Sequence, residues 1–102
     1  MPGTSTTTTT TPEVQERTDV RATILPPWRV MLHNDDVNTF EHVIASLLKT
    51  VPSLSPEDAT AITMEAHFNG VALVIVTPKE RAEFYRERLE ACGLTSTIEP
   101  DE

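Results

Sequence analysis

The sequence predicts an α+β domain with the element order β-α-α-β-α-β, in which three helices pack on a small, mostly antiparallel sheet of three strands. Three observations lead to this fold class. Short runs rich in apolar and β-branched side chains, at residues 28–33 and 71–76, are typical of strands. Three longer segments repeat apolar residues at helical spacing between start and stop signals. An alternating segment at residues 94–98 completes the sheet.

Residues 1–25 precede these elements and differ from them in composition. They are low in apolar residues and contain an unbroken threonine run at residues 6–11. Such a segment cannot bury enough surface to offset its ordering entropy, so we expect a disordered extension. It lacks the basic start and apolar core of a secretory signal, and no run reaches membrane-spanning length. We therefore expect one soluble domain at residues 26–99 and an acidic tail at residues 100–102.

The first predicted strand follows Pro26 and Pro27 and leads into a polar turn at residues 34–38. Thr39 is placed to cap the next helix, and Pro52 ends it. The apolar side chains that recur at helical spacing between them are Phe40, Val43, Ile44, Leu47, Leu48 and Val51. This spacing predicts an amphipathic helix directly after the turn.

A second helix is predicted to begin at Ser55, whose hydroxyl suits an N-cap, with Pro56 in the first turn. It runs to about Phe68 and ends at Gly70, because Asn-Gly favours a left-handed helix end. The apolar run at residues 71–76 follows at once and has no polar alternation. We therefore expect a well-buried strand there.

The sequence Thr-Pro-Lys-Glu at residues 77–80 fits a capping box that opens a third helix, with the proline at the first helical position. The apolar residues on one face of this helix are Ala82, Tyr85, Leu89 and Cys92. Gly93 is expected to end the helix, and residues 94–98 form the last strand.

The formal charge of −8 argues against nucleic-acid binding, because neutralising phosphates requires clustered Lys and Arg. The single cysteine, Cys92, excludes an internal disulfide and suits a reducing cytoplasm. It has no activating base nearby in the sequence, so we interpret it as a small buried hydrophobe. The composition thus favours a cytoplasmic protein that binds neither nucleic acid nor membrane.

The polar turn carries the most informative side chains. Asn34, Asp35 and Asp36 follow a strand and precede a helix. In such turns these residues often only bond their own backbone, but they also offer acceptors to a compact cation. His67, near the end of the second helix, either caps that helix or faces the turn and adds a neutral nitrogen acceptor.

The same region supplies candidates for other kinds of site. The residues that could supply metal ligands are His33, Asp35, Asp36, His42 and His67, and no pair of them has a recognised ligand spacing. Neither a Gly-x-Ser-x-Gly motif nor a phosphate-binding glycine loop is present. Spacing alone leaves open whether the apolar residues of the first two helices form ordinary core or line a pocket.

Residues 27–98 resemble the ClpS family of N-degron adaptors. The resemblance is carried by residues 28–36, by Thr-Phe-Glu-His-Val at residues 39–43 and by Glu-Ala-His-Phe-Asn-Gly at residues 65–70. It implies a protein that is not an enzyme and needs no cofactor or metal. Members of the family capture proteins with a free, bulky hydrophobic first residue (Leu, Phe, Tyr or Trp). The adaptors deliver these proteins to a Clp AAA+ unfoldase, ClpA or ClpC, for degradation by ClpP.

The resemblance assigns roles to three groups of residues. The substrate's α-amino group would be bound by Asn34, Asp35, Asp36 and His67. The hydrophobic side-chain pocket would be lined by Asn38, Phe40, Val43, Thr63, Ala66 and Leu94. The face that docks on the N-terminal domain of the unfoldase would include Glu80 and Tyr85. The resemblance also implies a monomer and matches the flexible N-terminal extension of the family.

Three pocket positions depart from the family pattern. Phe40 stands where a methionine commonly gates the pocket, Thr63 replaces another methionine, and Ala66 replaces a valine. The larger side chain at the entrance narrows the pocket, whereas the two smaller side chains in its wall widen it. The preference among Leu, Phe, Tyr and Trp therefore stays open. On the docking face Tyr85 replaces a frequent lysine.

Two alternatives come from other functional classes. One is a metal-dependent hydrolase that uses His33, Asp35, Asp36 and His67. The other is a purely structural interaction domain, since similar α+β arrangements serve other purposes and fold does not settle function. A stoichiometric metal would favour the first, and failure to bind any free N-terminus would favour the second.

Overall fold

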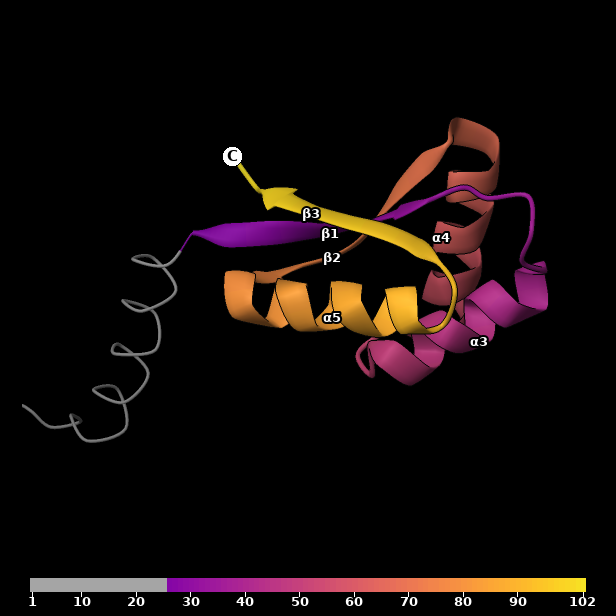
Figure 1. The fold of residues 1–102 in the computed structure, drawn as a ribbon, viewed down its shortest axis with the longest axis horizontal. Coiled ribbons are helices and arrows are strands. Elements are labelled where there is room, and N and C mark those ends of the chain that lie inside the picture. Colours follow the sequence, from indigo (N-terminus) through magenta and orange to yellow (C-terminus); the bar gives the residue numbers. More distant parts are fainter. Residues whose placement is uncertain (1–25) are drawn as a thin grey trace, which may run out of the picture.

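The computed structural model describes residues 26–102, and the extension predicted at residues 1–25 lies outside them. The elements of the described part are β1 (Pro27–His33), α3 (Phe40–Thr50), α4 (Pro56–Asn69), β2 (Val71–Pro78), α5 (Lys79–Ala91) and β3 (Thr95–Pro100). This is the predicted β-α-α-β-α-β order, so the fold class is confirmed (Figure 1).

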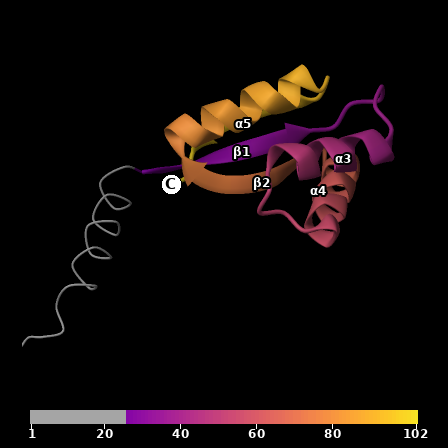
Figure 2. The ribbon, with the colours of Figure 1, turned by 90° about the horizontal axis from the view of Figure 1, so that it is seen from below.

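β1 is the central strand of the sheet, which has the order β2-β1-β3 and is antiparallel on both sides. α5 packs against all three strands. α3 and α4 pack on each other at the end of the sheet where β1 leads into the polar turn (Figures 1 and 2). The turn therefore lies beside two helices.

The core lies between the helices and one face of the sheet. Val30 and Leu32 of β1 are buried together with Leu47 of α3 and Leu89 of α5. Side chains alternate between the two faces of a strand, so the residues between them in β1, such as Met31, belong to the opposite face. This second face is not covered by helices, and we call it the open face.

β2 contradicts the prediction of a well-buried strand. Ala72 and Val74 are buried, but Leu73 and Val76 are 39% and 40% exposed. The prediction is wrong because the helices cover only one face of the sheet, so a continuous apolar run leaves half its side chains on the open face. The pairing with β1 also shifts register between Val30 and Met31, as expected for a bulge in β2.

The helix starts were predicted correctly in two cases out of three. Thr39 caps α3 and Ser55 caps α4, the latter in a reciprocal capping box with Asp58. The capping box predicted at residues 77–80 is absent. The N-cap of α5 is Pro78 and not Thr77, and no side chain accepts a hydrogen bond at this helix start. Thr77 is instead paired with Trp28 in the sheet, which takes it away from the helix start.

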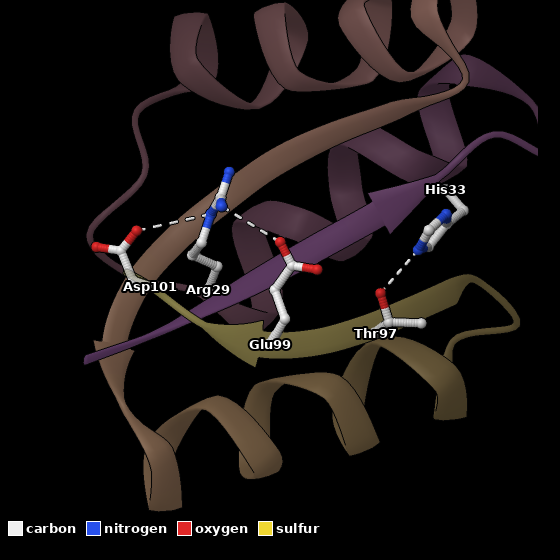
Figure 3. A network of polar contacts seen from close by, with 5 residues as sticks. All are labelled: Arg29, His33, Thr97, Glu99 and Asp101. Atoms are coloured by element: carbon white, nitrogen blue, oxygen red, sulfur yellow. Dashed lines mark hydrogen bonds and ion pairs between the residues drawn. The ribbon is translucent and has the colours of Figure 1, made fainter. Parts of the chain in front are cut away.

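The last strand runs beyond the predicted end at residue 98. On the open face the Arg29 guanidinium lies 3.3 Å from a carboxylate oxygen of Glu99 and 3.7 Å from one of Asp101 (Figure 3). The Asp101 backbone N–H also donates to the Pro27 carbonyl at 3.0 Å. Of the acidic tail expected at residues 100–102, Pro100 is thus part of β3 and Asp101 is bonded to the start of β1.

Candidate functional site

The polar turn after β1 is organised around the Asp35 carboxylate. Its Oδ1 accepts the backbone N–H groups of Val37 and Asn38, each at 2.9 Å. The Asn38 side-chain amide donates to the same carboxylate, at 3.1 Å to Oδ2. Asp35 thus bonds its own backbone, as turn aspartates often do. Oδ2 still has room for a further donor, because a carboxylate offers about four acceptor sites.

The ends of α4 and α5 hold the turn in place. The Asn34 N–H donates to the carbonyl of Gly70 at 3.0 Å, and the Asn38 amide donates to that of Gly93 at 2.9 Å. Gly70 and Gly93 have φ values of 90° and 88°, the left-handed geometry that ends a helix most easily at glycine. Both helix ends predicted from glycine are therefore confirmed, and each also supplies an acceptor to the turn.

His42 adds a third connection to the same place. Its Nε2 lies 2.7 Å from the carbonyl oxygen of Cys92, which makes the imidazole the donor. Sequence reasoning weighed His42 only as a metal ligand and missed this role. The two residues are 50 positions apart in the chain, so no local pattern could have indicated the contact.

Between the turn, the end of β1, α3 and α4 lies a hollow that encloses about 310 Å³, counting its open mouth. We call it the pocket. The residues that line it are Leu32, His33, Asn34, Asp35, Asn38, Phe40, Val43, Thr63, Ala66 and His67.

The pocket is polar at its mouth and mostly apolar inside. Asn34 and His67 are exposed, whereas Leu32, Thr63 and Ala66 are nearly inaccessible to solvent. Carboxamide, carboxylate and imidazole groups together offer acceptors for a small cation. The arrangement therefore suits a ligand that carries an ammonium group next to an apolar side chain.

The helix side of the mouth is built from aromatic rings. The ring centroids of Phe40 and His67 lie 5.0 Å apart at an interplanar angle of 77°. Phe68 also contacts His67, with 4.9 Å between centroids and an angle of 73°. Such edge-to-face pairs are favourable, so contacts with two rings help to orient the imidazole.

The turn keeps Asp35 ionised. The backbone N–H of Asn38 is the main cause that lowers the pKa of Asp35 below its ordinary value of 3.8. The Asn38 side chain, the Val37 N–H and the positive potential of His42 act in the same direction, and burial opposes them. Hydrogen bonds to the charged form thus win over desolvation. The mouth of the pocket carries a fixed negative charge at neutral pH.

Asp36 and Leu94, expected at the amine site and in the side-chain pocket, are not among the lining residues, and Glu80 and Tyr85 belong to the expected docking face. Asp36 is exposed, and Leu94 belongs to the core with 4% exposure. Glu80 is exposed in the first turn of α5, but Tyr85 is 8% exposed and packs into the core. The exposed aromatic residue of that helix is Phe84, which sequence reasoning did not single out.

The geometry does not favour a metal centre at these residues. Within residues 26–102, no three His, Cys, Asp or Glu side chains converge on a point that could hold a metal ion. His33 Nε2 instead lies 2.8 Å from Thr97 Oγ1 on the open face (Figure 3), and Asp35 is engaged by donors from Val37 and Asn38. The hydrolase alternative therefore lacks a geometric basis in the described part of the chain.

The fold and the pocket define a small α+β binding domain with an anionic mouth. The ClpS family model, described as ATP-dependent Clp protease adaptor protein ClpS, matches residues 24–97. The chain therefore belongs to the ClpS family, and its role is that of an adapter of the Clp protease, a regulator of proteolysis.

Known relatives agree with this assignment. The chain is 52% identical over 85 residues to the ATP-dependent Clp protease adapter protein ClpS of Synechococcus elongatus, covering 83% of this chain and 90% of that protein. It is 43% identical over 94 residues to the chloroplastic adapter protein CLPS1 of Arabidopsis thaliana, covering 90% of this chain and 59% of that protein.

None of the helices in residues 26–102 has the length and apolar character needed to cross a membrane.

A solved structure shares the fold. Agrobacterium tumefaciens ClpS2, in a structure bound to L-phenylalaninamide, superposes with a TM-score of 0.72 at 29% identity. The match covers 76% of this chain and 99% of that one. The fold predicted from the sequence is therefore also that of a solved ClpS protein.

Proposed function

We propose that this adapter binds proteins through a free N-terminal α-amino group and a bulky hydrophobic first side chain, Leu, Phe, Tyr or Trp. The α-ammonium would lie at the mouth, with Asn34, Asp35 and His67 as acceptors. The first side chain would enter the pocket past Phe40. The observation that carries the proposal is that Asn34, Asp35 and His67 line the same hollow as the apolar side chains of Leu32, Val43 and Ala66.

The chemistry of the mouth matches an ammonium group in number and charge. A protonated amine has three donors, and the mouth offers a carboxamide, a carboxylate and an imidazole. Each charge-assisted hydrogen bond contributes about 1.5–3 kcal/mol, and burying the first side chain adds roughly as much. After the costs of association, a dissociation constant on the order of micromolar follows. Asp36, outside the lining, would contribute only to the negative potential at the entrance.

The ligand of the solved relative supports the same reading of the pocket. L-phenylalaninamide, present in the Agrobacterium tumefaciens ClpS2 structure, combines a free α-amine with a phenyl side chain. These are the two groups for which the mouth and the pocket of this chain offer partners.

Delivery would be to the N-terminal domain of a Clp AAA+ unfoldase, ClpA or ClpC, working with ClpP in the cytoplasm. The docking face would lie on α5 and include Glu80, which is exposed in its first turn. Tyr85 could take part only through the small part of its ring that reaches the surface. The adapter would act as a monomer.

Fluorescence anisotropy with labelled peptides tests the binding step. Peptides that begin with Leu, Phe, Tyr or Trp should bind, whereas an acetylated Leu peptide should not, because acetylation removes the charge and leaves the acceptors unpaired. His67→Ala should weaken binding by about tenfold, the value of one charge-assisted hydrogen bond. If no free N-terminus binds to the folded protein, the function is that of a structural interaction domain.

A further inference from the structure

Thr63 is the most buried polar side chain in the pocket lining. It lies on α4 four residues before His67, so the two side chains share a helix face and lie about 6 Å apart along the axis. His67 is exposed at the mouth, but Thr63 is only 3% exposed. A side chain that enters from the mouth and extends inward along α4 would approach Thr63 with its far end.

The hydroxyl of Thr63 can act toward a ligand only as an acceptor. It donates its single hydrogen to the Ala59 carbonyl of its own helix at 2.8 Å. A hydroxyl oxygen has two lone pairs, and these remain available. Because the hydrogen is already satisfied, an apolar ligand beside Thr63 leaves no buried donor without a partner.

Thr63 is also the one polar residue among the lining residues that are buried. The other deep lining residues, Leu32 and Ala66, are apolar. Asn38 lies at the turn, where its amide donates to Asp35 and to the Gly93 carbonyl. The inner wall of the pocket thus combines an apolar surface with one buried oxygen acceptor.

We propose that Thr63 selects tyrosine as the first residue of the substrate, by accepting a hydrogen bond from the phenolic O–H through Oγ1. This inference rests on the amine-binding function proposed above. Tyrosine combines a planar apolar ring with one donor at its far end. In an all-apolar pocket that donor would be buried without a partner, and tyrosine would bind more weakly than phenylalanine.

The test compares matched peptides that differ only in a first residue of Tyr, Phe or Leu. Their dissociation constants are measured with the unmodified protein, Thr63→Val and Thr63→Ser. Valine keeps the shape of threonine and removes the acceptor, whereas serine keeps the oxygen. We expect Thr63→Val to weaken Tyr binding by about tenfold while Phe and Leu change by less than about twofold. Thr63→Ser should keep the Tyr-to-Phe ratio of the unmodified protein.

The ratio of the Phe and Tyr dissociation constants separates the outcomes. A fall in the ratio of about threefold or more in Thr63→Val, beyond the effect of one weak contact, supports the role of Thr63. A smaller change, with all three peptides still bound, overturns it and leaves the amine-binding function intact. If the unmodified protein binds none of the peptides, the proposed function itself fails, and this inference fails with it.

Discussion

Asp35 on the turn side of the pocket and His67 on the helix side face the same hollow, but different interactions hold them. Asp35 is fixed by directed hydrogen bonds from two backbone N–H groups and the Asn38 amide. His67 makes edge-to-face contacts with the rings of Phe40 and Phe68. Hydrogen bonds fix an angle as well as a distance, whereas ring packing tolerates small rotations. We therefore expect the Asp35 carboxylate to keep a fixed position, whereas the His67 ring can rotate slightly when a ligand binds.

The largest effect should come from breaking the turn side. Asp35→Ala removes the fixed charge and the acceptor that orders the turn, so peptide affinity should fall about a hundredfold or more. Asp36→Ala is the matched control. It also removes one negative charge from the turn, but the Asp36 side chain does not line the pocket. Its effect in the same anisotropy assay should stay within about twofold. Equal losses in both variants would mean that only the net charge matters.

A smaller effect is expected on the helix side. Phe68→Ala removes one of the two rings around His67, and affinity should fall by about threefold because the imidazole becomes less well oriented. Phe84→Ala is the control, since Phe84 is also an exposed aromatic residue but lies on α5 outside the pocket. A loss as large as that of Asp35→Ala would show that the helix side is as rigid as the turn.

The smallest effect concerns stability and pH. Because the pKa of Asp35 is lowered in the folded state, its charge stabilises the fold at pH values above 3.8, and this contribution is lost as pH falls through the folded value. Asp35→Asn keeps an oxygen acceptor and removes the charge. The variant should be less stable at pH 7 by up to about 1 kcal/mol. The difference, measured by urea unfolding, should shrink as pH falls below 3.8, and a difference independent of pH would contradict the role of the charge.

Local signals predicted most of the fold. Thr39, Ser55, Gly70 and Gly93 each act on the backbone next to them, so helix starts and ends could be located from single residues. The failure at Thr77 has a tertiary cause, because pairing with Trp28 outweighs the local capping pattern. The apolar run of β2 was misjudged since a strand pattern does not tell which sheet face the helices will cover.

The site was predictable only in part. The turn and His67 were located from residue type and resemblance, and the structure brings Asn34, Asp35 and His67 to one hollow. Leu94 was expected in the pocket, but it is buried in the core beyond Gly93. The contact of Asn38 with Gly93 joins residues 55 positions apart, and no spacing rule indicates it. Long-range contacts of this kind determine the side-chain directions that sequence patterns leave open.

The central place of β1 has a consequence for the order in which the domain assembles. β1 is synthesised before both of its neighbours, and the Ser96 hydroxyl that bonds the Met31 carbonyl lies 65 residues further along the chain. Pairings over such distances form late, because loop closure must precede them. The polar turn directly follows β1 and is anchored to Gly93, just before β3. The polar turn therefore cannot gain its full set of hydrogen bonds until the segment around Gly93 and β3 is available.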